Sequence, residues 1–319
     1  MVNNKLVKTS LRAAYGETLV ELGHKNPDIV VLDADLACST QTGKFAKVFP
    51  DRFFNMGVAE QDAIGTAAGL STCGKIPFVS TFAIFASGRA WDQVRNSVAY
   101  PSFNVKIVAT HGGITVGEDG ASHQSLEDIS LMRSIPNMTV IIPADSIEAK
   151  EAVKFAAEYK GPVYIRLNRP QTPLIFDENR YLFNFPKARI LKEGLDVTIA
   201  ANGETLYEAL ECAKILEEKG ILAEIINVPV VKPLDENTII KSVKKTGAIL
   251  TVENHSVIGG LGSAVCECVS ENYPVLVKRV GVKDKFGQSG KEYELMIEYG
   301  LTAGKFINEV IELIERKNS

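Results

Sequence analysis

Short apolar runs alternate with amphipathic stretches along the first half of the chain. Runs rich in β-branched residues predict strands, and stretches with helical periodicity predict the helices between them. We expect strands at 29–32, 76–80, 105–109, 140–142 and 163–165, and helices at 11–22, 60–73, 88–99 and 146–159. Strands that alternate with helices are typical of a mostly parallel sheet covered by helices. The pattern therefore predicts one layered α/β domain over residues 1–170.

A second, smaller domain of the same class is predicted after an irregular segment. The periodicity is lost from residue 168, and three prolines follow before residue 188, so we place a linker at 171–188. Beyond it we expect strands at 196–201, 223–228, 248–253 and 275–280, and helices at 204–219, 235–244, 261–271 and about 305–316. These elements predict another mostly parallel sheet flanked by helices over residues 189–319. A chain of 319 residues is long enough for two such cores.

The composition narrows the functional classes. Hydrophobic residues make up 45% and charged residues 23% of the chain, which is ordinary for a soluble globular protein. No apolar run approaches the ~20 residues of a membrane span, and a net charge of -4 with dispersed lysines argues against nucleic-acid binding. The N-terminal residues lack the apolar core of a secretory signal, and the five cysteines have no framework spacing. We expect a cytoplasmic protein without membrane or nucleic-acid partners.

One glycine-rich turn imitates a dinucleotide-binding motif. Residues 258–264, IGGLGSA, follow a predicted strand and open a predicted helix, but the third glycine of the motif is missing. A tight turn that caps the helix is the favoured interpretation. The chain has no GxxxxGK[ST] and no CxxC, and its four histidines lack metal-like spacing. We therefore expect no metal to be bound by this chain alone.

Two other stretches carry candidate chemistry. Residues 109–124, ATHGGITVGEDGASHQ, place His111, Asp119 and His123 in a glycine-rich loop directly after a strand, where α/β sheets bind ligands. Taken alone, these residues leave a ligand site and a structural role about equally open. Residues 57–69, GVAEQDAIGTAAG, place Glu60 at the start of a run of small residues, where a carboxylate is expected to be poorly solvated. Taken alone, Glu60 fits a helix N-terminus, where its charge is favourable.

Several motifs together resemble the transketolase family of thiamine-diphosphate enzymes. They are GVAEQ (57–61), STFAIF (80–85), GEDGxxHQ (117–124), MRSIPN (132–137), KPLD (232–235) and ENHSVIGGLGSA (253–264). The likeness covers nearly the whole chain and implies a pyrimidine-binding domain followed by a transketolase C-terminal domain. The GDG motif with which the family holds the diphosphate is absent from the sequence. The resemblance therefore implies the C-terminal-type subunit of a split, two-chain transketolase.

That resemblance also implies the cofactor and the partner. Thiamine diphosphate would rest its pyrimidine on this chain, while an N-terminal-type subunit would hold the diphosphate and its Mg²⁺ or Ca²⁺. The active site would then lie between chains. This chain is expected to pair with itself within an assembly of two copies of each subunit.

Individual roles follow from matching positions in the family. Glu60 would engage the pyrimidine nitrogen N1′, and Phe85, with Phe82 beside it, would stack on the ring. Asp35 matches an aspartate near the cofactor, and His123 matches a catalytic position that faces both cofactor and substrate. The positions that match contacts to a sugar phosphate are Arg12, Ser39, His111, Asp119 and Arg166.

The implied activity is transfer of a two-carbon ketol unit from a ketose phosphate to an aldose phosphate, as in the pentose phosphate pathway of carbohydrate metabolism. Three alternatives stay open: a deoxyxylulose-phosphate-synthase-like subunit, a 2-oxoacid-dehydrogenase-β-like subunit, and a non-catalytic scaffold. Glu127 and Asp128, which follow His-Gln, favour transketolase over the synthase. The GEDGxxH loop disfavours the dehydrogenase subunit. The retained pattern of acid, histidines and arginine argues against a scaffold.

Overall fold

Seven strands form the sheet of the first domain, in the order β12-β6-β7-β5-β4-β2-β3. The computed structural model describes residues 7–319. Six strands of this sheet pair in parallel: β2 (Ile29–Asp33), β3 (Phe53–Asn55), β4 (Ile76–Phe82), β5 (Lys106–Thr110), β6 (Thr139–Ile141) and β7 (Val163–Arg166). The five predicted strands are therefore confirmed. β3 was not predicted, because three residues are too short to show a period.

Helices cover both faces of this sheet. On one face α1 (Leu11–Lys25) and α7 (Ser146–Glu158) share an apolar core, and on the other α4 (Glu60–Thr72) packs through alanines and Ile64. The helix predicted at 88–99 is instead two π-helical turns, η2 (Phe85–Arg89) and η3 (Val94–Ala99), on either side of α5 (Trp91–Gln93). The difference arises because a π turn and an α turn give similar apolar spacing over so short a segment. Single π turns are frequent at functional sites.

Shorter elements connect these layers. They are β1 (Lys8–Thr9), α2 (Ala37–Thr40), α3 (Gly43–Val48), η1 (Pro50–Arg52), η4 (Ile114–Asp119), α6 (Asp128–Ser134) and β8 (Thr172–Pro173). The segment predicted as a linker contains β8, which pairs antiparallel with β1 and ties the linker to the start of the first domain.

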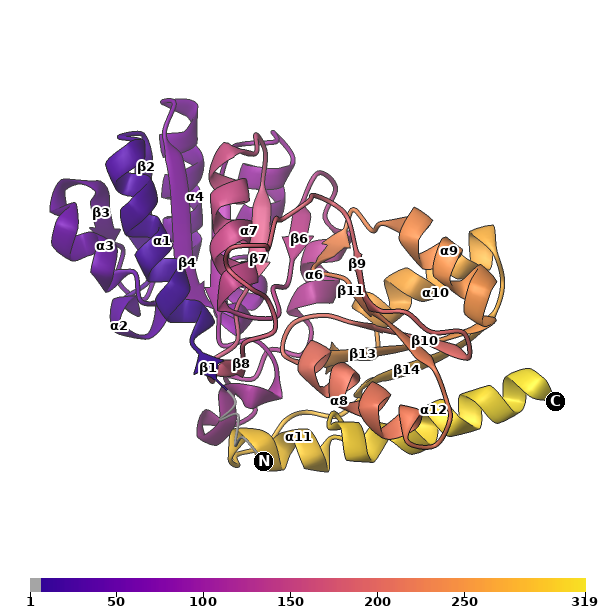
Figure 1. Cartoon of the computed structure of the whole chain (residues 1–319). Coiled ribbons are helices and arrows are strands. Elements are labelled where there is room, and N and C mark those ends of the chain that lie inside the picture. Colours follow the sequence, from indigo (N-terminus) through magenta and orange to yellow (C-terminus); the bar gives the residue numbers. More distant parts are fainter. Residues whose placement is uncertain (1–6) are drawn as a thin grey trace.

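Five strands form the second sheet, in the order β14-β13-β10-β11-β9. They are β9 (Arg189–Lys192), β10 (Val197–Ala201), β11 (Ala223–Asn227), β13 (Ala248–Ser256) and β14 (Leu276–Val282). The first, β9, is an unpredicted antiparallel edge strand, and the others pair in parallel. The helices are α8 (Thr205–Glu217), α9 (Glu236–Thr246), α10 (Leu261–Asn272), α11 (Glu292–Glu298) and α12 (Ala303–Asn318). The two domains lie side by side, with α8 and α12 together along one side of the second (Figure 1).

The two domains are tied together by a strand and by a continuous core. β12 (Val230–Lys232) leaves the second domain and pairs antiparallel with β6 of the first sheet. One apolar cluster runs from Ala63 and Val94 in the first domain to Ile239 and Leu261 in the second. Separating the domains would expose this cluster and the edge of β6. Within residues 7–319, no helix combines the length and the apolar character needed to cross a bilayer.

Candidate active site

The candidate residues gather at one edge of the first sheet. Asp35, Phe85 and His111 each follow, within three residues, the carboxyl end of β2, β4 or β5. Because these strands are parallel neighbours, their carboxyl ends lie at the same edge. The pattern that predicted strands therefore also places the site.

Four rings form the centre of the site. The Phe82 ring stacks on His111 with centroids 3.8 Å apart and lies 5.8 Å from the Phe85 ring. His123 stands edge-on to both phenylalanines, 5.5 Å from Phe85 and 6.2 Å from Phe82. The two histidines thus reach one aromatic surface from opposite ends of their glycine-rich loop. Phe85 and His123 remain half-buried, which leaves that surface open to a ligand.

Glu60 is only 4% exposed at the first residue of α4. Its carboxylate forms an ion pair with Arg89, whose Nη1 donates a hydrogen bond to Oε1 at 3.2 Å. The same guanidinium lies over the Phe85 ring, with Cζ 4.1 Å from the ring centroid. A planar nitrogen group therefore occupies the space between the predicted acid and the predicted stacking ring. A protonated aminopyrimidine would need the same two partners, so these residues fit the pyrimidine of thiamine diphosphate.

Two arginines stand near His111. Arg12 donates from Nη1 to the carbonyl of Ser39 at 2.6 Å and from Nη2 to the carbonyl of Arg169 at 2.9 Å. Its buried Nε has no hydrogen-bond partner among the described residues. Burial lowers the pKa of His111 to about 3, with further lowering by the charges of Arg12, Arg169 and His123. His111 is therefore neutral at physiological pH, and the surrounding positive charge favours an anion.

The two predicted aspartates are exposed. Asp35 has a positive φ of 62° just after β2 and accepts a hydrogen bond from Asn55 Nδ2 at 3.0 Å. Asp119 ends the η4 turn between the two histidines. Asp33 is buried instead, where Thr40 and Thr42 donate to its carboxylate. Asp33 therefore orders the turn that carries Asp35 and Ser39.

Arg166 lies apart from this open surface. Its side chain is 6% exposed, and its Nε lies 2.9 Å from Oδ2 of Asp128. Its Nη2 donates to the carbonyls of Ser125 and Asn254, at 3.2 and 2.8 Å. The expected contact with a sugar phosphate receives no support from this geometry, because the charge is already neutralised. Arg166 instead joins the histidine loop, α6 and the second domain.

The second domain supports the histidine loop directly. Gln124 donates from Nε2 to the carbonyls of Ile114 and Gln288, at 3.0 and 2.9 Å. Gly113 has a positive φ of 79°, and a Cβ built there would lie 2.3 Å from Asn254 Nδ2. Asn254 in turn accepts from the backbone of Ile114 at 3.0 Å. A larger residue at position 113 would therefore displace the contact between the domains.

The glycine-rich turn at 258–264 is occupied by the protein itself. Glu253 accepts hydrogen bonds from the backbone nitrogens of Leu261 and Gly262, at 2.7 and 2.8 Å. These are the donors that a dinucleotide phosphate would need at the start of α10. A Cβ on Gly260 would lie 2.0 Å from Glu253 Oε2. The interpretation as a tight turn that caps the helix is confirmed.

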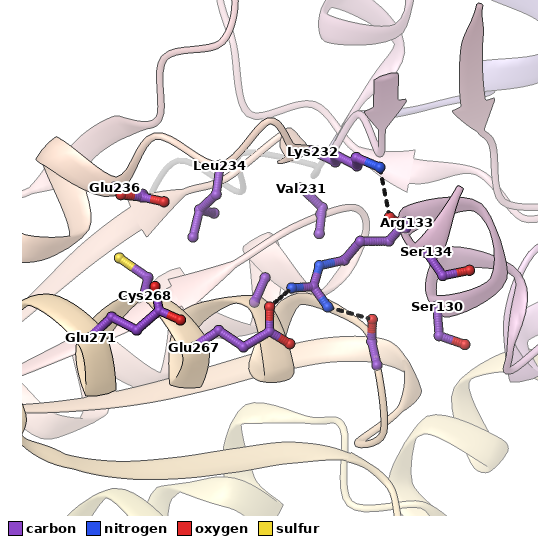
Figure 2. Close-up of a pocket in the computed structure, with 12 residues that line it drawn as sticks. Ser130, Arg133, Ser134, Val231, Lys232, Leu234, Glu236, Glu267, Cys268 and Glu271 are labelled. Atoms are coloured by element: carbon purple, nitrogen blue, oxygen red, sulfur yellow. Dashed lines mark hydrogen bonds and ion pairs between the residues drawn. The ribbon is translucent and has the colours of Figure 1, made fainter. Parts of the chain in front are cut away.

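A cavity of about 520 Å³ lies between the domains and away from these rings. Figure 2 shows Arg133 of α6 reaching toward Glu267 of α10, with Lys232 beside it. Lys232 donates to the carbonyl of Arg133 at 2.9 Å. The two cationic side chains that line the cavity, Arg133 and Lys232, are thus bound to other protein groups. None of the predicted site residues lines this cavity.

Two residues of the site were missed from the sequence. Arg169 stands three residues after β7, where the predicted irregular segment begins. Its position after a parallel strand was a signal that could have identified it. Arg89 was missed because the helix was predicted to begin at residue 88, whereas the helical turn η2 begins at Phe85 and places Arg89, four residues on, over the Phe85 ring.

Comparisons with known proteins identify the family of both domains. The family described as "Transketolase, pyrimidine binding domain" matches residues 7–174, and "Transketolase, C-terminal domain" matches residues 186–305. The chain belongs to the transketolase family. It is 53% identical over 319 residues to a putative transketolase C-terminal section of Methanocaldococcus jannaschii, with 99% of this chain and 100% of that protein covered.

Further transketolase relatives include other separate subunits. A 6-deoxy-6-sulfo-D-fructose transketolase subunit of a Clostridium species is 48% identical, with 98% of this chain and 97% of that protein covered. A solved structure described as "Split gene transketolase, inactive beta4 tetramer" has a TM-score of 0.90 and 53% identity, with 97% of this chain and 99% of that chain covered. The prediction of a split-transketolase C-terminal subunit is thereby confirmed.

Proposed function

We propose that this transketolase subunit binds the pyrimidine of thiamine diphosphate and, with a partner subunit, transfers a two-carbon ketol unit between sugar phosphates. The observation that carries the proposal is the placement of a planar nitrogen group between Glu60 and Phe85. The same two contacts suit an aminopyrimidine. When bound, the cofactor would supply a stabilised carbanion for making and breaking carbon–carbon bonds.

This chain's own residues would bind and orient the reactants. Glu60 would hold N1′ of the pyrimidine by a hydrogen bond, and Phe85 would fix the tilt of the ring. His123, edge-on to Phe85, is placed to hold or move a proton at a substrate hydroxyl. Asp35 and Asp119, exposed at the rim, are proposed to contact the cofactor and a substrate hydroxyl, respectively.

The anionic end of the substrate would lie near His111. Arg12 and Arg169 supply positive charge there, and Ser39 is held beside Arg12. Guanidinium groups bind phosphate through paired N–H donors. Arg166, which the family resemblance matches to this contact, is proposed instead to position the loop. A sulfonate, like a phosphate, would place an anionic group at the end of the substrate. The relative named for 6-deoxy-6-sulfo-D-fructose therefore makes a specialised substrate an alternative to a common ketose phosphate.

The diphosphate and its Mg²⁺ or Ca²⁺ are proposed to bind on a second, N-terminal-type subunit in the cytoplasm. Within residues 7–319, no group of three or more histidine, cysteine or acidic side chains is arranged to hold a metal ion. Human transketolase is 37% identical over 313 residues, and this chain corresponds to 50% of its length. We infer an assembly of two copies of each subunit.

The substitution Glu60→Gln tests the proposal in the co-expressed complex. Loss of this acid is expected to lower ketol transfer by about 10²–10⁴-fold while the circular dichroism spectrum is retained. Glu17→Gln is the matched control, because Glu17 is an exposed acid on α1 that pairs only with Lys44 among residues 7–319. Wild-type turnover in the Glu60 variant would remove Glu60 from the mechanism. Activity on 2-oxoacids, but not on sugar phosphates, would favour the dehydrogenase alternative.

A further inference from the structure

Arg89 lies in the space that the proposed function reserves for the cofactor. Among the described residues, it is the hydrogen-bond partner of the Glu60 carboxylate, and it covers the Phe85 ring at the same time. A pyrimidine could not make both contacts while the guanidinium makes them, because both groups would need the same space beside the Glu60 carboxylate and over the Phe85 ring. The two arrangements therefore exclude one another.

The Arg89 side chain is free to leave while its backbone stays in place. Its carbonyl accepts a hydrogen bond from Gln61 Nε2 at 2.9 Å, which ties the end of η2 to the start of α4. The side chain itself is 52% exposed, whereas that of Glu60 is 5% exposed. A rotation toward solvent would thus rehydrate the guanidinium and leave the acid and the ring in position.

The closed contact also has a function in the absence of a ligand. A buried carboxylate without a partner is costly, and Arg89 supplies a counter-charge to Glu60 until another donor arrives. Its interactions are modest, because ion pairs that reach solvent and exposed cation–π contacts are each weak. Such a contact can hold a site closed most of the time and still yield to a tight ligand.

We propose that Arg89 is a latch on the pyrimidine site, which closes onto Glu60 and Phe85 in the free subunit and must swing out before the cofactor binds. The inference rests on the proposed function. A latch that is closed in about nine molecules of ten lowers the apparent affinity of the cofactor tenfold, because only the open fraction binds. Removal of the latch should therefore tighten binding.

The test is cofactor affinity in the co-expressed complex, measured by calorimetric titration of thiamine diphosphate with Mg²⁺. Arg89→Met keeps an unbranched apolar stem over Phe85 and is expected to lower the dissociation constant about tenfold. Arg89→Ala is expected to act in the same direction. Arg95→Ala is the matched control, because Arg95 is an exposed arginine on η3 that contacts only Asn96 among the described residues. It should leave the dissociation constant unchanged.

The outcomes separate the latch from the proposed function. An unchanged or weaker affinity in both Arg89 variants would overturn the latch. A crystal structure of the wild-type complex with the cofactor bound offers a second measurement that needs no variant: the latch predicts that Cζ of Arg89 has left the Phe85 ring. A guanidinium still stacked there beside bound cofactor would also overturn it. If neither wild-type nor variant complexes bind thiamine diphosphate, the proposed function fails instead.

Discussion

Arg166 offers a decisive test of how the site is held, because its sequence-based role and its observed environment differ. The substitution Arg166→Ala would remove a guanidinium that joins Asp128 of α6, the Ser125 carbonyl of the histidine loop and the Asn254 carbonyl of the second domain. If Arg166 bound phosphate, its loss would affect substrate binding. If it positions the loop, its loss should affect stability and turnover together.

The magnitude follows from burial. Asp128 is fully buried and, besides the ion pair, accepts a hydrogen bond from the Tyr164 hydroxyl at 2.7 Å. Removal of one partner from a buried ion pair leaves an uncompensated charge, which costs about 3–5 kcal/mol. Replacement of both partners, as in Arg166→Met with Asp128→Asn, leaves no charge behind and keeps an acceptor for Tyr164. We expect the pair of substitutions to recover more than half of the lost stability.

The assay combines urea unfolding of the purified chain with kinetics of the reconstituted complex. The single variant should unfold at lower urea, and its kcat should fall on phosphorylated and unphosphorylated ketoses alike. The reasoning would be refuted by an unfolding free energy within about 1 kcal/mol of wild type, combined with a higher KM for phosphorylated substrates alone. That result would support Arg166 as a contact to the substrate phosphate.

Two other residues allow sharp tests. Arg169→Ala is expected to raise KM for a ketose phosphate by about tenfold or more, because it removes a charge-assisted contact. The KM for an unphosphorylated ketose should stay unchanged. Equal effects on both KM values would place Arg169 outside the substrate site. Burial raises the pKa of Glu148 to about 7, above an ordinary value of 4.5, although Tyr181, Ala144 and Asn227 donate to it. A raised pKa in the folded state gives stability that is present below about 4.5 and lost as the pH rises through about 7. Glu148→Gln should therefore flatten the pH dependence of the unfolding free energy between pH 4.5 and 7, to which Glu148 contributes about 3 kcal/mol in wild type. An unchanged slope would contradict this assignment.

Periodicity was sufficient to predict most of the framework. The parallel strands are apolar on both faces, and helices such as α7 carry an explicit cap at Asp145, so both are visible in a single sequence. The short pieces were missed because they depend on distant partners. β12 is a strand only because β6 offers its edge, and β8 only because β1 lies beside it.

The site divides in the same way. The histidine loop and Glu60 were predicted because glycines and small residues mark close approach, and the chemistry assigned to them by the family motifs stays a prediction. The environment of Arg166 could not be predicted, because its ion pair and its hydrogen bonds together join residues from three separate segments. The contact of Arg89 was not predicted either, since the predicted helix began at residue 88 and so left Phe85 outside it. Sequence patterns show which residues line an edge, and they leave open which charges are already paired.

Contacts between the domains also explain why the second domain matters to a candidate site built on the first. Asn254 and Gln288 of the second domain hold the loop that carries His111 and His123, and β12 completes the first sheet. Each of these two hydrogen bonds joins a backbone group to a side chain, Ile114 N to Asn254 Oδ1 and Gln124 Nε2 to the Gln288 carbonyl, and together they fix the position of the loop. A substrate could thus change through exposed residues at the rim while the two histidines stay fixed against Phe82. We infer that a rigid centre with a variable rim would allow relatives named for different sugars to share one fold.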